Sequence, residues 1–352
     1  MESFSGGHDP CFQYSSSVKE KATMKSYRDR SYARWRTYGH SCFSGFYRIR
    51  LLIVFSFVFA ATLLLTRASS LMGWSRDHQT PQVPFRSRYT VVINTWKRND
   101  LLKRSISHYS ACQGVDAIRI VWSEPNVPTE RLRTSVENLV SVASRKKDEF
   151  ISVQFDIHVN DDLNNRFKPL DDLRTDAILS IDDDVLVPCS TLETAFSVWT
   201  SAPHSMVGFV PRMHWVKAKN PSFGSYEYSY GGWWSVWWMG TYSMVLSKAA
   251  FIHKKYLDLY TNELPASIRQ YVKDERNCED IAMSFLVANE TGAPPIWIKT
   301  RIYEIGSTGI SSLQGHSEHR TDCINHFVTL FGSMPLVASN VKVADARHLW
   351  FW

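Results

Sequence analysis

The stretch Ile178-Leu-Ser-Ile-Asp182-Asp183-Asp184-Val-Leu186 reads as an apolar β-strand that ends in three adjacent carboxylates. Short β-branched runs at 89–94 and 117–122 and an alternating run at 151–159 precede it in the chain. Helical patterns lie between these runs, one beginning near Asp100 and one at 129–144. Strands that alternate with helices predict an α/β fold with a mostly parallel sheet and right-handed crossovers.

Ligands of such sheets bind at the carboxyl ends of the strands. We therefore expect the functional side chains to follow Ile93, Trp122 and Ile181. The patterns G-x-G-x-x-G and G-x-x-x-x-G-K-[ST] are absent from the sequence, so neither a dinucleotide fingerprint nor a P-loop is available.

The three aspartates suggest a divalent cation. Asp182 and Asp184 point to one face of an extended chain and Asp183 to the other. Adjacent acids repel one another unless a cation or hydrogen-bond donors neutralise them. A hard cation held by one or two carboxylates and by diphosphate oxygens would fit, and it would neutralise a departing nucleoside diphosphate. A solvated acidic cap at the end of a strand remains the alternative when the triplet is taken alone.

Further motifs place the triplet in a context. These motifs are Asn164-Asn-Arg166-Phe, Ile181-Asp-Asp-Asp184, Ala195-Phe-Ser-Val-Trp199, Val207-Gly-Phe-Val-Pro-Arg212, Tyr242-Ser-Met-Val245, Asn277-Cys-Glu-Asp-Ile-Ala-Met283 and Cys323-Ile-Asn325. With them, the chain from about Tyr89 to about Asn340 resembles the exostosin-like glycosyltransferases of family 64. The resemblance implies a GT-A (Rossmann-like) fold, a nucleotide-sugar donor, Mn2+ and transfer with retention of anomeric configuration.

The resemblance also implies roles for residues on the donor side. Asn94 and Arg98 would line the nucleotide, Arg166 the diphosphate, Asp182 the ribose, Asp183 the donor sugar hydroxyls and Asp184 the metal. A guanidinium suits the diphosphate because it pairs bidentately with phosphate, although surface ion pairs would also explain these arginines. The family usually has Asn five residues before the arginine, where this chain has Asp161. This departure concerns the base or ribose contact and suggests a different nucleotide.

A second group of residues would surround the anomeric carbon. The resemblance places Asp280 beside that carbon, with Asn277 and Glu279 next to it and Arg320 from a later segment. A carboxylate there would serve retention either as a nucleophile or by stabilising an oxocarbenium-like state, and both routes stay open.

The resemblance further implies a disulfide between Cys278 and Cys323, which would tether Asp280 near Arg320. Two separate buried thiols are the alternative for this pair. Cys112 and Cys189 have no assigned partner.

Residues 51–66 (LLIVFSFVFAATLLLT) carry no charge and are bracketed by arginines, which predicts a single transmembrane signal anchor. A buried core helix and a cleaved signal peptide are the alternatives. The anchor divides the chain into a tail at 1–50, a polar stem at 67–88 and a catalytic domain at 89–352. Nine basic and four acidic residues give the tail a charge of +5, which predicts a cytosolic tail and a lumenal domain.

This single-pass type II topology suggests the Golgi membrane. The sequon at Asn289 and four of the cysteines would then lie in an oxidising lumen. The domain itself holds 27 basic and 29 acidic residues, a charge of −2, so nothing supports a nucleic-acid partner.

The chain has one catalytic domain behind a short anchor, and in this it resembles the plant-type glycosylinositol phosphorylceramide mannosyltransferases of the family. The resemblance implies transfer of α-mannose from GDP-mannose to the headgroup of that membrane glycolipid. The alternatives are an α-N-acetylhexosaminyltransferase that uses a UDP-sugar on a glycan acceptor and a non-catalytic glycan-binding relative.

Gly231-Gly-Trp-Trp-Ser-Val-Trp-Trp-Met239 is the most unusual local run, with four tryptophans in six positions. Core packing is one interpretation. The other is an exposed platform that stacks on sugar rings or lies at the membrane interface.

Overall fold

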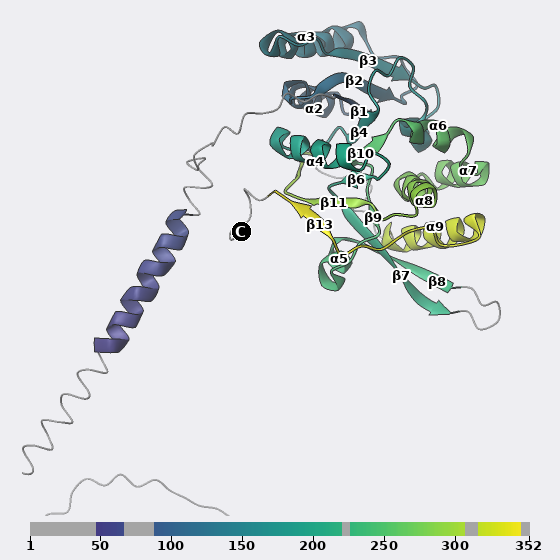
Figure 1. Cartoon of the computed structure of the whole chain (residues 1–352). Coiled ribbons are helices and arrows are strands. Elements are labelled where there is room, and N and C mark those ends of the chain that lie inside the picture. The colour runs from purple at the N-terminus through teal and green to yellow at the C-terminus, as the bar shows by residue number, and fades with distance from the viewer. Residues whose placement is uncertain (1–46, 67–87, 220–225, 307–315, 346–352) are drawn as a thin grey trace, which may run out of the picture. The chain divides into compact units, whose positions relative to one another are not determined.

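The computed structural model describes residues 47–66, 88–219, 226–306 and 316–345 (Figure 1). The chain separates into two compact units, with the boundary between Gln82 and Val83. The described part of the first unit is the helix Tyr47–Thr66. The described part of the second is an α/β domain that begins with strand β1.

The domain is built on an eight-stranded sheet in the order β13-β11-β6-β10-β4-β1-β2-β3. The strands are β1 (Tyr89–Thr95), β2 (Val115–Trp122), β3 (Ser152–Ile157), β4 (Ala177–Asp182), β6 (Val207–Gly208), β10 (Ala249–His253), β11 (Ile296–Lys299) and β13 (Lys342–Ala344). Only β10 runs antiparallel to its neighbours, β4 and β6. The mostly parallel sheet predicted from the sequence is therefore confirmed.

Helices α2 (Asn99–Ala111) and α3 (Glu130–Lys147) connect the first three strands. Thr129 caps α3, because its hydroxyl accepts a hydrogen bond from the backbone N–H of Leu132. The helix ends at Asp148, whose backbone is left-handed, and three basic residues in the last turn complement the helix dipole. The predicted helix at 129–144 is thus present and extends to Lys147.

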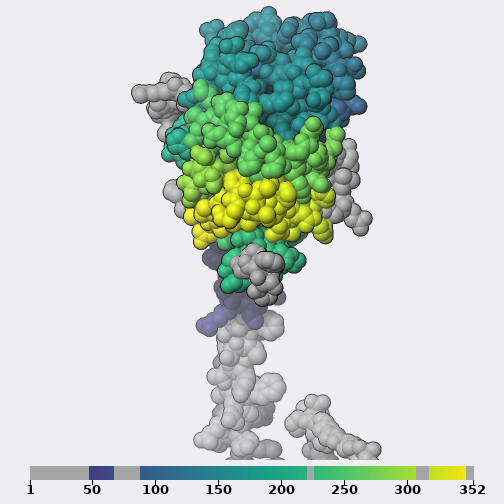
Figure 2. Space-filling view, turned by 90° about the vertical axis from the view of Figure 1, so that its right-hand side faces the viewer, coloured from purple at the N-terminus to yellow at the C-terminus, as the bar shows by residue number. Residues whose placement is uncertain are grey.

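Hydrophobic cores lie on both faces of the sheet. Val91 and Ile93 of β1 point to the core formed with α2, α3 and α4 (Cys189–Ser201). Val92, between them, belongs to the other core, because neighbouring side chains of a strand face opposite sides. That core holds α6 (Lys255–Asn262), α7 (Ala266–Glu275), α8 (Glu279–Thr291) and α9 (His316–Phe331). Figure 2 shows α9 in yellow beside the green segments of the same face.

A smaller sheet of order β8-β7-β9 lies next to α9. It contains β7 (Pro211–Lys219), β8 (Tyr226–Gly231) and β9 (Met244–Val245). The short helix α5 (Trp233–Met239) follows β8 and contacts β7 (Figure 1). A two-stranded sheet joins β5 (Val185–Leu186) to β12 (Tyr303–Glu304), and a 3-10 turn, η1 (Leu163–Phe167), follows β3.

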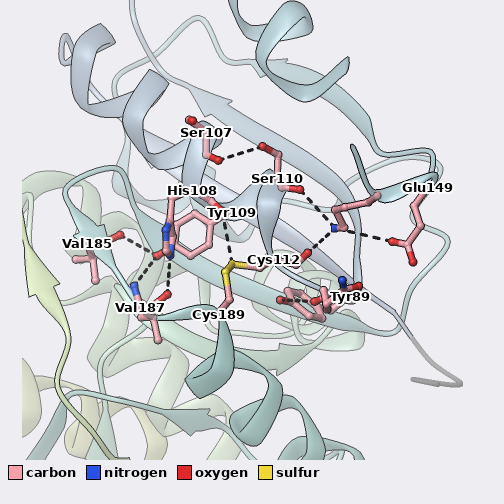
Figure 3. Close-up of a disulfide and its surroundings, with 12 residues drawn as sticks. Tyr89, Ser107, His108, Tyr109, Ser110, Cys112, Glu149, Val185, Val187 and Cys189 are labelled. Atoms are coloured by element: carbon pink, nitrogen blue, oxygen red, sulfur yellow. Dashed lines mark hydrogen bonds and ion pairs between the residues drawn. A yellow bond between two sulfur atoms is a disulfide. The ribbon is translucent and has the colours of Figure 1, made fainter. Parts of the chain in front are cut away.

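Cys112 and Cys189, which sequence reasoning left unpaired, form a disulfide (Figure 3). The bond joins the end of α2 to the start of α4. Next to it, the hydroxyl of Tyr109 donates to the carbonyl of Val185 at 2.8 Å, and His108 Nε2 is 2.8 Å from the carbonyl of Val187. The segment that leaves the three aspartates is therefore fastened to α2.

The helix Tyr47–Thr66 is 20 residues long and is the one helix among the described residues that is long and apolar enough to cross a membrane. It begins four residues before the predicted span, so Arg48 and Arg50 belong to its first turn. At about 1.5 Å per residue it covers about 30 Å, the thickness of a hydrocarbon core. None of its side chains is buried, so the core-helix alternative has no support.

Candidate active site

The carboxyl ends of β1 and β4 bring the first predicted residues together. Asn94 lies opposite Asp182 in the parallel register, and the carbonyl of Asn94 accepts a hydrogen bond from the N–H of Asp183. A cavity of about 510 Å³ opens at this edge of the sheet. Its lining includes Asn94, Arg98, Arg166, Asp182, Asp184, Asn277, Glu279, Asp280 and Arg320, which are all the predicted substrate, metal and catalytic residues except Asp183.

The three aspartates alternate as the sequence predicts. Asp182 and Asp184 line the cavity, whereas Asp183 is fully buried. The Asp183 carboxylate accepts a hydrogen bond from Thr95 Oγ1 at 2.6 Å and pairs with Arg98 Nη2 at 2.6 Å. Burial raises the pKa of Asp183 to about 6 despite these partners. Its expected contact with the donor sugar stays a prediction, and its contacts in the structure fix the backbone between its two neighbours.

Arg98 joins the buried aspartate to the exposed one. Its Nη1 lies 2.7 Å from Asp184 Oδ2, while Nη2 pairs with Asp183. One guanidinium thus pairs with two of the three adjacent carboxylates and offsets one unit of their negative charge. The N–H of Ile305 donates to the carbonyl of Asp184 at 2.7 Å, so β12 also holds this loop.

Arg166 is the centre of a second charge network. Its side chain is 4% exposed and pairs with Asp182 and with Glu279 Oε1, the latter at 3.3 Å. Its Nη1 also donates to Ser247 Oγ at 3.1 Å. A guanidinium with so little access to water is held in place by these acids, and η1 carries it into the cavity.

Glu279 is the acid of this network with the most perturbed pKa. Burial, together with the charge of Asp280, raises the pKa of Glu279 to about 7, and Arg166 opposes the rise. Burial therefore favours the protonated form of this carboxyl more than it would for an exposed glutamate. Because α8 begins at Glu279, the helix dipole also favours acids in this first turn.

Asp280 forms the third cluster with Arg320. Asp280 Oδ2 accepts a hydrogen bond from Arg320 Nη2 at 2.9 Å, and Arg320 Nη1 donates to the hydroxyl of Tyr230 at 3.1 Å. Asp280 and Arg320 are both nearly buried, at 4% and 7% exposure. Asp280 Oδ1 accepts from the N–H of Ile281, so each oxygen of the carboxylate has a donor.

The Cys278–Cys323 disulfide, implied by the family resemblance, is present with the Cα atoms 6.4 Å apart. It ties the start of α8 to α9, which carries Arg320 three residues earlier. Cys278 adopts a left-handed backbone with φ of 73°, which turns the chain abruptly into α8. In the chain-entropy model such a crosslink stabilises the fold by about 4 kcal/mol. The disulfide thus fixes the distance between the two elements that supply Asp280 and Arg320.

Two further ion pairs lie along the cavity. Asp161 pairs with Arg276, which is 60% exposed, and Lys248 pairs with Glu304 at 2.6 Å. All four residues are part of the lining. Asp161 follows the end of β3, so the cavity extends from the end of β4 toward the end of β3.

Asp184 has the surroundings that a hard cation requires. Its carboxylate is 20% exposed in the cavity. A side chain at Gly306 would place its Cβ 2.9 Å from Asp184 Oδ2, so glycine at this position leaves room beside the oxygen that pairs with Arg98. One carboxylate, with diphosphate and water oxygens, is a donor set of the kind that Mg²⁺ or Mn²⁺ accepts.

Another group of potential metal ligands occurs among the described residues, His108 with Cys112 and Cys189. The two sulfurs form the disulfide, so the group has no thiolate to bind a metal (Figure 3). The imidazole of His108 is hydrogen-bonded to the carbonyl of Val187.

Three residues that position the site were missed by sequence reasoning: Thr95, Tyr230 and Ser247, which bond Asp183, Arg320 and Arg166. Thr95 directly follows Asn94 and could have been suspected, because it stands at the carboxyl end of β1. Tyr230 and Ser247 carry no local signal, since tertiary contacts alone bring them to Arg320 and Arg166.

A model of the glycosyl transferase family 64 domain matches residues 89–350 of the chain. The chain belongs to this family. Family 64 relatives cover most of the domain. Glycosylinositol phosphorylceramide mannosyl transferase 1 of Arabidopsis thaliana is 60% identical over 267 residues, 76% of this chain and 79% of the relative. Exostosin-like 2 of Mus musculus is 31% identical, over 79% of this chain and 83% of its own length.

A solved structure, a mannosyltransferase from Pyrobaculum calidifontis in complex with GDP-Man and Mn2+, matches with a TM-score of 0.41 and 14% identity. It covers 77% of this chain and 71% of that one, and so distant a likeness supports no conclusion about the chain.

The protein is therefore a glycosyltransferase, and the site has the parts that this chemistry needs. Arg166 and Arg98 bring positive charge to the cavity, of the kind that could pair with a diphosphate, and Asp184 brings a carboxylate that could ligate a cation. Asp280 supplies a fixed carboxylate in the same cavity, where it can stabilise positive charge that develops on a sugar ring.

Proposed function

We propose that the protein is a retaining, metal-dependent mannosyltransferase that transfers α-mannose from GDP-mannose to the headgroup of glycosylinositol phosphorylceramide. The observation that carries the proposal is the meeting, in one cavity, of Asp184 and Asp280 with Arg166 and Arg320. In this set, Arg166 and the cation at Asp184 would bind the diphosphate, and Asp280 would face the sugar. The name of the 60% identical plant relative supports the choice of mannose and of the lipid acceptor.

Mn2+ is the proposed cofactor, with Asp184 as its protein ligand. When bound, it would neutralise charge on the departing nucleoside diphosphate. Arg166 holds the diphosphate, and Asp182 and Glu279 hold Arg166 in turn. Arg320 orients Asp280 for the sugar through the hydrogen bond described above.

The proposed location is the Golgi membrane, with a single-pass type II orientation. Two disulfides in the domain favour an oxidising lumen, and the basic tail at 1–50 favours the cytosol. The sequon residue Asn289 is exposed in the last turn of α8, where an oligosaccharide could be attached.

The donor is tested by incubating the full chain in detergent with Mn2+ and, in separate reactions, GDP-mannose, UDP-GlcNAc and UDP-GalNAc. We expect transfer to the sphingolipid acceptor with GDP-mannose alone and none after chelation by EDTA. Turnover with a UDP-sugar only would refute the proposed donor and favour the N-acetylhexosaminyltransferase alternative. Absence of any metal-dependent turnover, including donor hydrolysis, would favour a non-catalytic relative.

Asp161 offers a reason for guanine. The Watson–Crick edge of guanine presents one acceptor, O6, followed by two donors, N1–H and N2–H₂. The Arg276–Asp161 pair presents the complementary order, a guanidinium donor beside a carboxylate with two acceptor oxygens. Uracil has one N–H between two carbonyls and would place an oxygen against the carboxylate. We propose that Asp161 reads the donor base.

Asp161→Asn is expected to reduce the preference for GDP over UDP by about 5–150-fold, the value of one bidentate base contact. The asparagine side chain offers one acceptor and one donor, so it matches the edge of uracil better than it matches the edge of guanine. The dissociation constants of both nucleotides with Mn2+, measured by calorimetry, give the ratio. Asp172→Asn, the same change at an exposed position outside the cavity, is the matched control. An unchanged ratio for Asp161→Asn would exclude a base contact.

A further inference from the structure

Helix α5 carries an exposed cluster of indole rings, the aromatic patch, formed by Trp233, Trp234, Trp237 and Trp238. The exposed fractions of the four side chains are 49%, 73%, 61% and 81%. Core packing is therefore the wrong interpretation of this run. Large contiguous apolar patches on a protein surface mark sites of interaction with a partner or a membrane.

Helix α5, which carries the aromatic patch, is packed against the core of the domain. Val236, in the middle of α5, is 3% exposed and belongs to the core beneath the helix. A Cβ on Gly231, the last residue of β8, would lie 2.7 Å from side-chain atoms of Met213 in β7 and of Ser235 in α5, so glycine lets α5 lie close against this sheet. The indoles therefore face solvent because the backbone fixes them there.

The chemistry of the patch fits a lipid surface. Helix α5 has no charged residue, and indole rings prefer the bilayer interface, where the apolar body is buried and the N–H stays hydrated. Neighbouring rings are steeply inclined to one another, with interplanar angles of 79° for Trp233–Trp234, 86° for Trp234–Trp237 and 46° for Trp237–Trp238. Rings inclined in this way do not form a flat platform for a chain of sugars, whereas insertion among headgroups needs no common plane.

The chain also brings a lipid surface within reach. The apolar helix ends at Thr66 and the domain begins at Tyr89, so 22 residues connect them. At about 3.4 Å per residue the connection spans at most about 75 Å. A bilayer crossed by the helix is thus held at high effective concentration near the domain, so even weak insertion of the patch would be populated.

The patch is continuous with the cavity. Gly232, the residue before Trp233, lines the cavity that holds Arg320. Tyr230, two residues earlier, lines it as well. We propose that the aromatic patch inserts into the interface of the bilayer to which the chain is anchored and holds the cavity at the lipid surface. This inference requires the anchor but neither the identity of the donor nor that of the acceptor.

The test uses the full chain in phosphatidylcholine nanodiscs, with and without lipids brominated in the acyl chain near the headgroup. Bromine quenches tryptophan at short range. The helix Tyr47–Thr66 has no tryptophan, and Trp35 and Trp74, which flank it in the sequence, are replaced by Phe throughout, with the chain that carries only these two changes serving as the wild type. Brominated lipids should quench the fluorescence of the wild type, and Trp234→Ser/Trp238→Ser should lose most of that quenching. Trp297→Phe, which removes a partly buried tryptophan of β11, should retain it.

Equal quenching in the wild type and the double variant would overturn the proposal, even if the indoles were then found to bind a second protein copy or a sugar. Melting temperatures of both variants verify folding. A second readout is the KM for acceptor embedded in the nanodisc, which should rise about tenfold or more in the double variant while metal-dependent donor hydrolysis is unchanged. The quenching result stands even if the proposed acceptor is wrong, because it reports lipid contact without catalysis.

Discussion

Asp184→Asn is expected to lower the rate of transfer by about 10³-fold, equivalent to about 4 kcal/mol of lost transition-state stabilisation. Asparagine keeps the shape of the side chain but removes the charge that a divalent cation requires. The domain should stay folded, because the change removes one of three adjacent negative charges and leaves Arg98 paired with Asp183. The rate is measured at saturating donor and Mn2+.

The metal site has a readout apart from activity. In the wild type, Mn2+ with GDP should raise the melting temperature, whereas in Asp184→Asn the added Mn2+ should have no effect beyond that of GDP. Asp176→Asn is the matched control, since Asp176 immediately precedes β4 and lies at the opposite end of the same strand. A wild-type response to Mn2+ in Asp184→Asn would show that another residue ligates the cation.

Arg166→Ala is expected to reduce the free energy of unfolding by about 3–5 kcal/mol, because it leaves Asp182 and Glu279 without their shared cation. For a domain of this size the melting temperature should fall by about 6–20 °C. Arg174→Ala, which breaks an ion pair of a half-exposed arginine with Asp116, should change stability by less than about 1 kcal/mol. A similar effect of both variants would show that the buried network contributes no more than a surface pair.

The loss in free energy of unfolding caused by Arg166→Ala should become larger as the pH rises. The pKa of Glu279 in the fold, about 7, is raised above that of the unfolded chain, so its contribution to stability is complete below about pH 4.5 and is lost as pH rises through 7. Removing Arg166 raises the pKa of Glu279 further, because the charge of Arg166 lowers it. The variant therefore continues to lose stability at pH values where the wild type has stopped losing it. The free energy of unfolding in urea should therefore differ more between Arg166→Ala and the wild type at pH 8 than at pH 6. When both chains also carry Glu279→Gln, this difference should no longer depend on pH.

Much of the fold could be read from local patterns. The runs at 89–94, 117–122 and 177–181 are mostly apolar on both sides, which is the pattern of parallel strands buried between two layers of helices. The period-two rule also separated Asp182 and Asp184 from Asp183 correctly. The pairing of Cys278 with Cys323 was available from the family resemblance and is confirmed.

Other features needed the folded chain. Nothing in the spacing of Cys112 and Cys189, 77 residues apart, reveals that α2 ends beside the start of α4. The exposure of the aromatic patch was equally hidden, since a tryptophan-rich run is typical of cores and only the mounting of α5 through Val236 turns the indoles outward. The partners of the charged residues, such as Tyr230 for Arg320, come from strands remote in sequence.

Residue types and their spacing were enough to predict the order of elements along this chain and the side chains of its candidate site: an apolar span after a basic tail, alternating strands and helices, and acids and arginines of the family pattern. These are properties of residue type and short-range spacing, which the strand and helix periods convert into direction. The tertiary structure alone decided which charges share a partner, which acid is buried and which aromatic surface faces solvent. Those outcomes depend on distances between segments far apart in the chain, and only packing sets such distances.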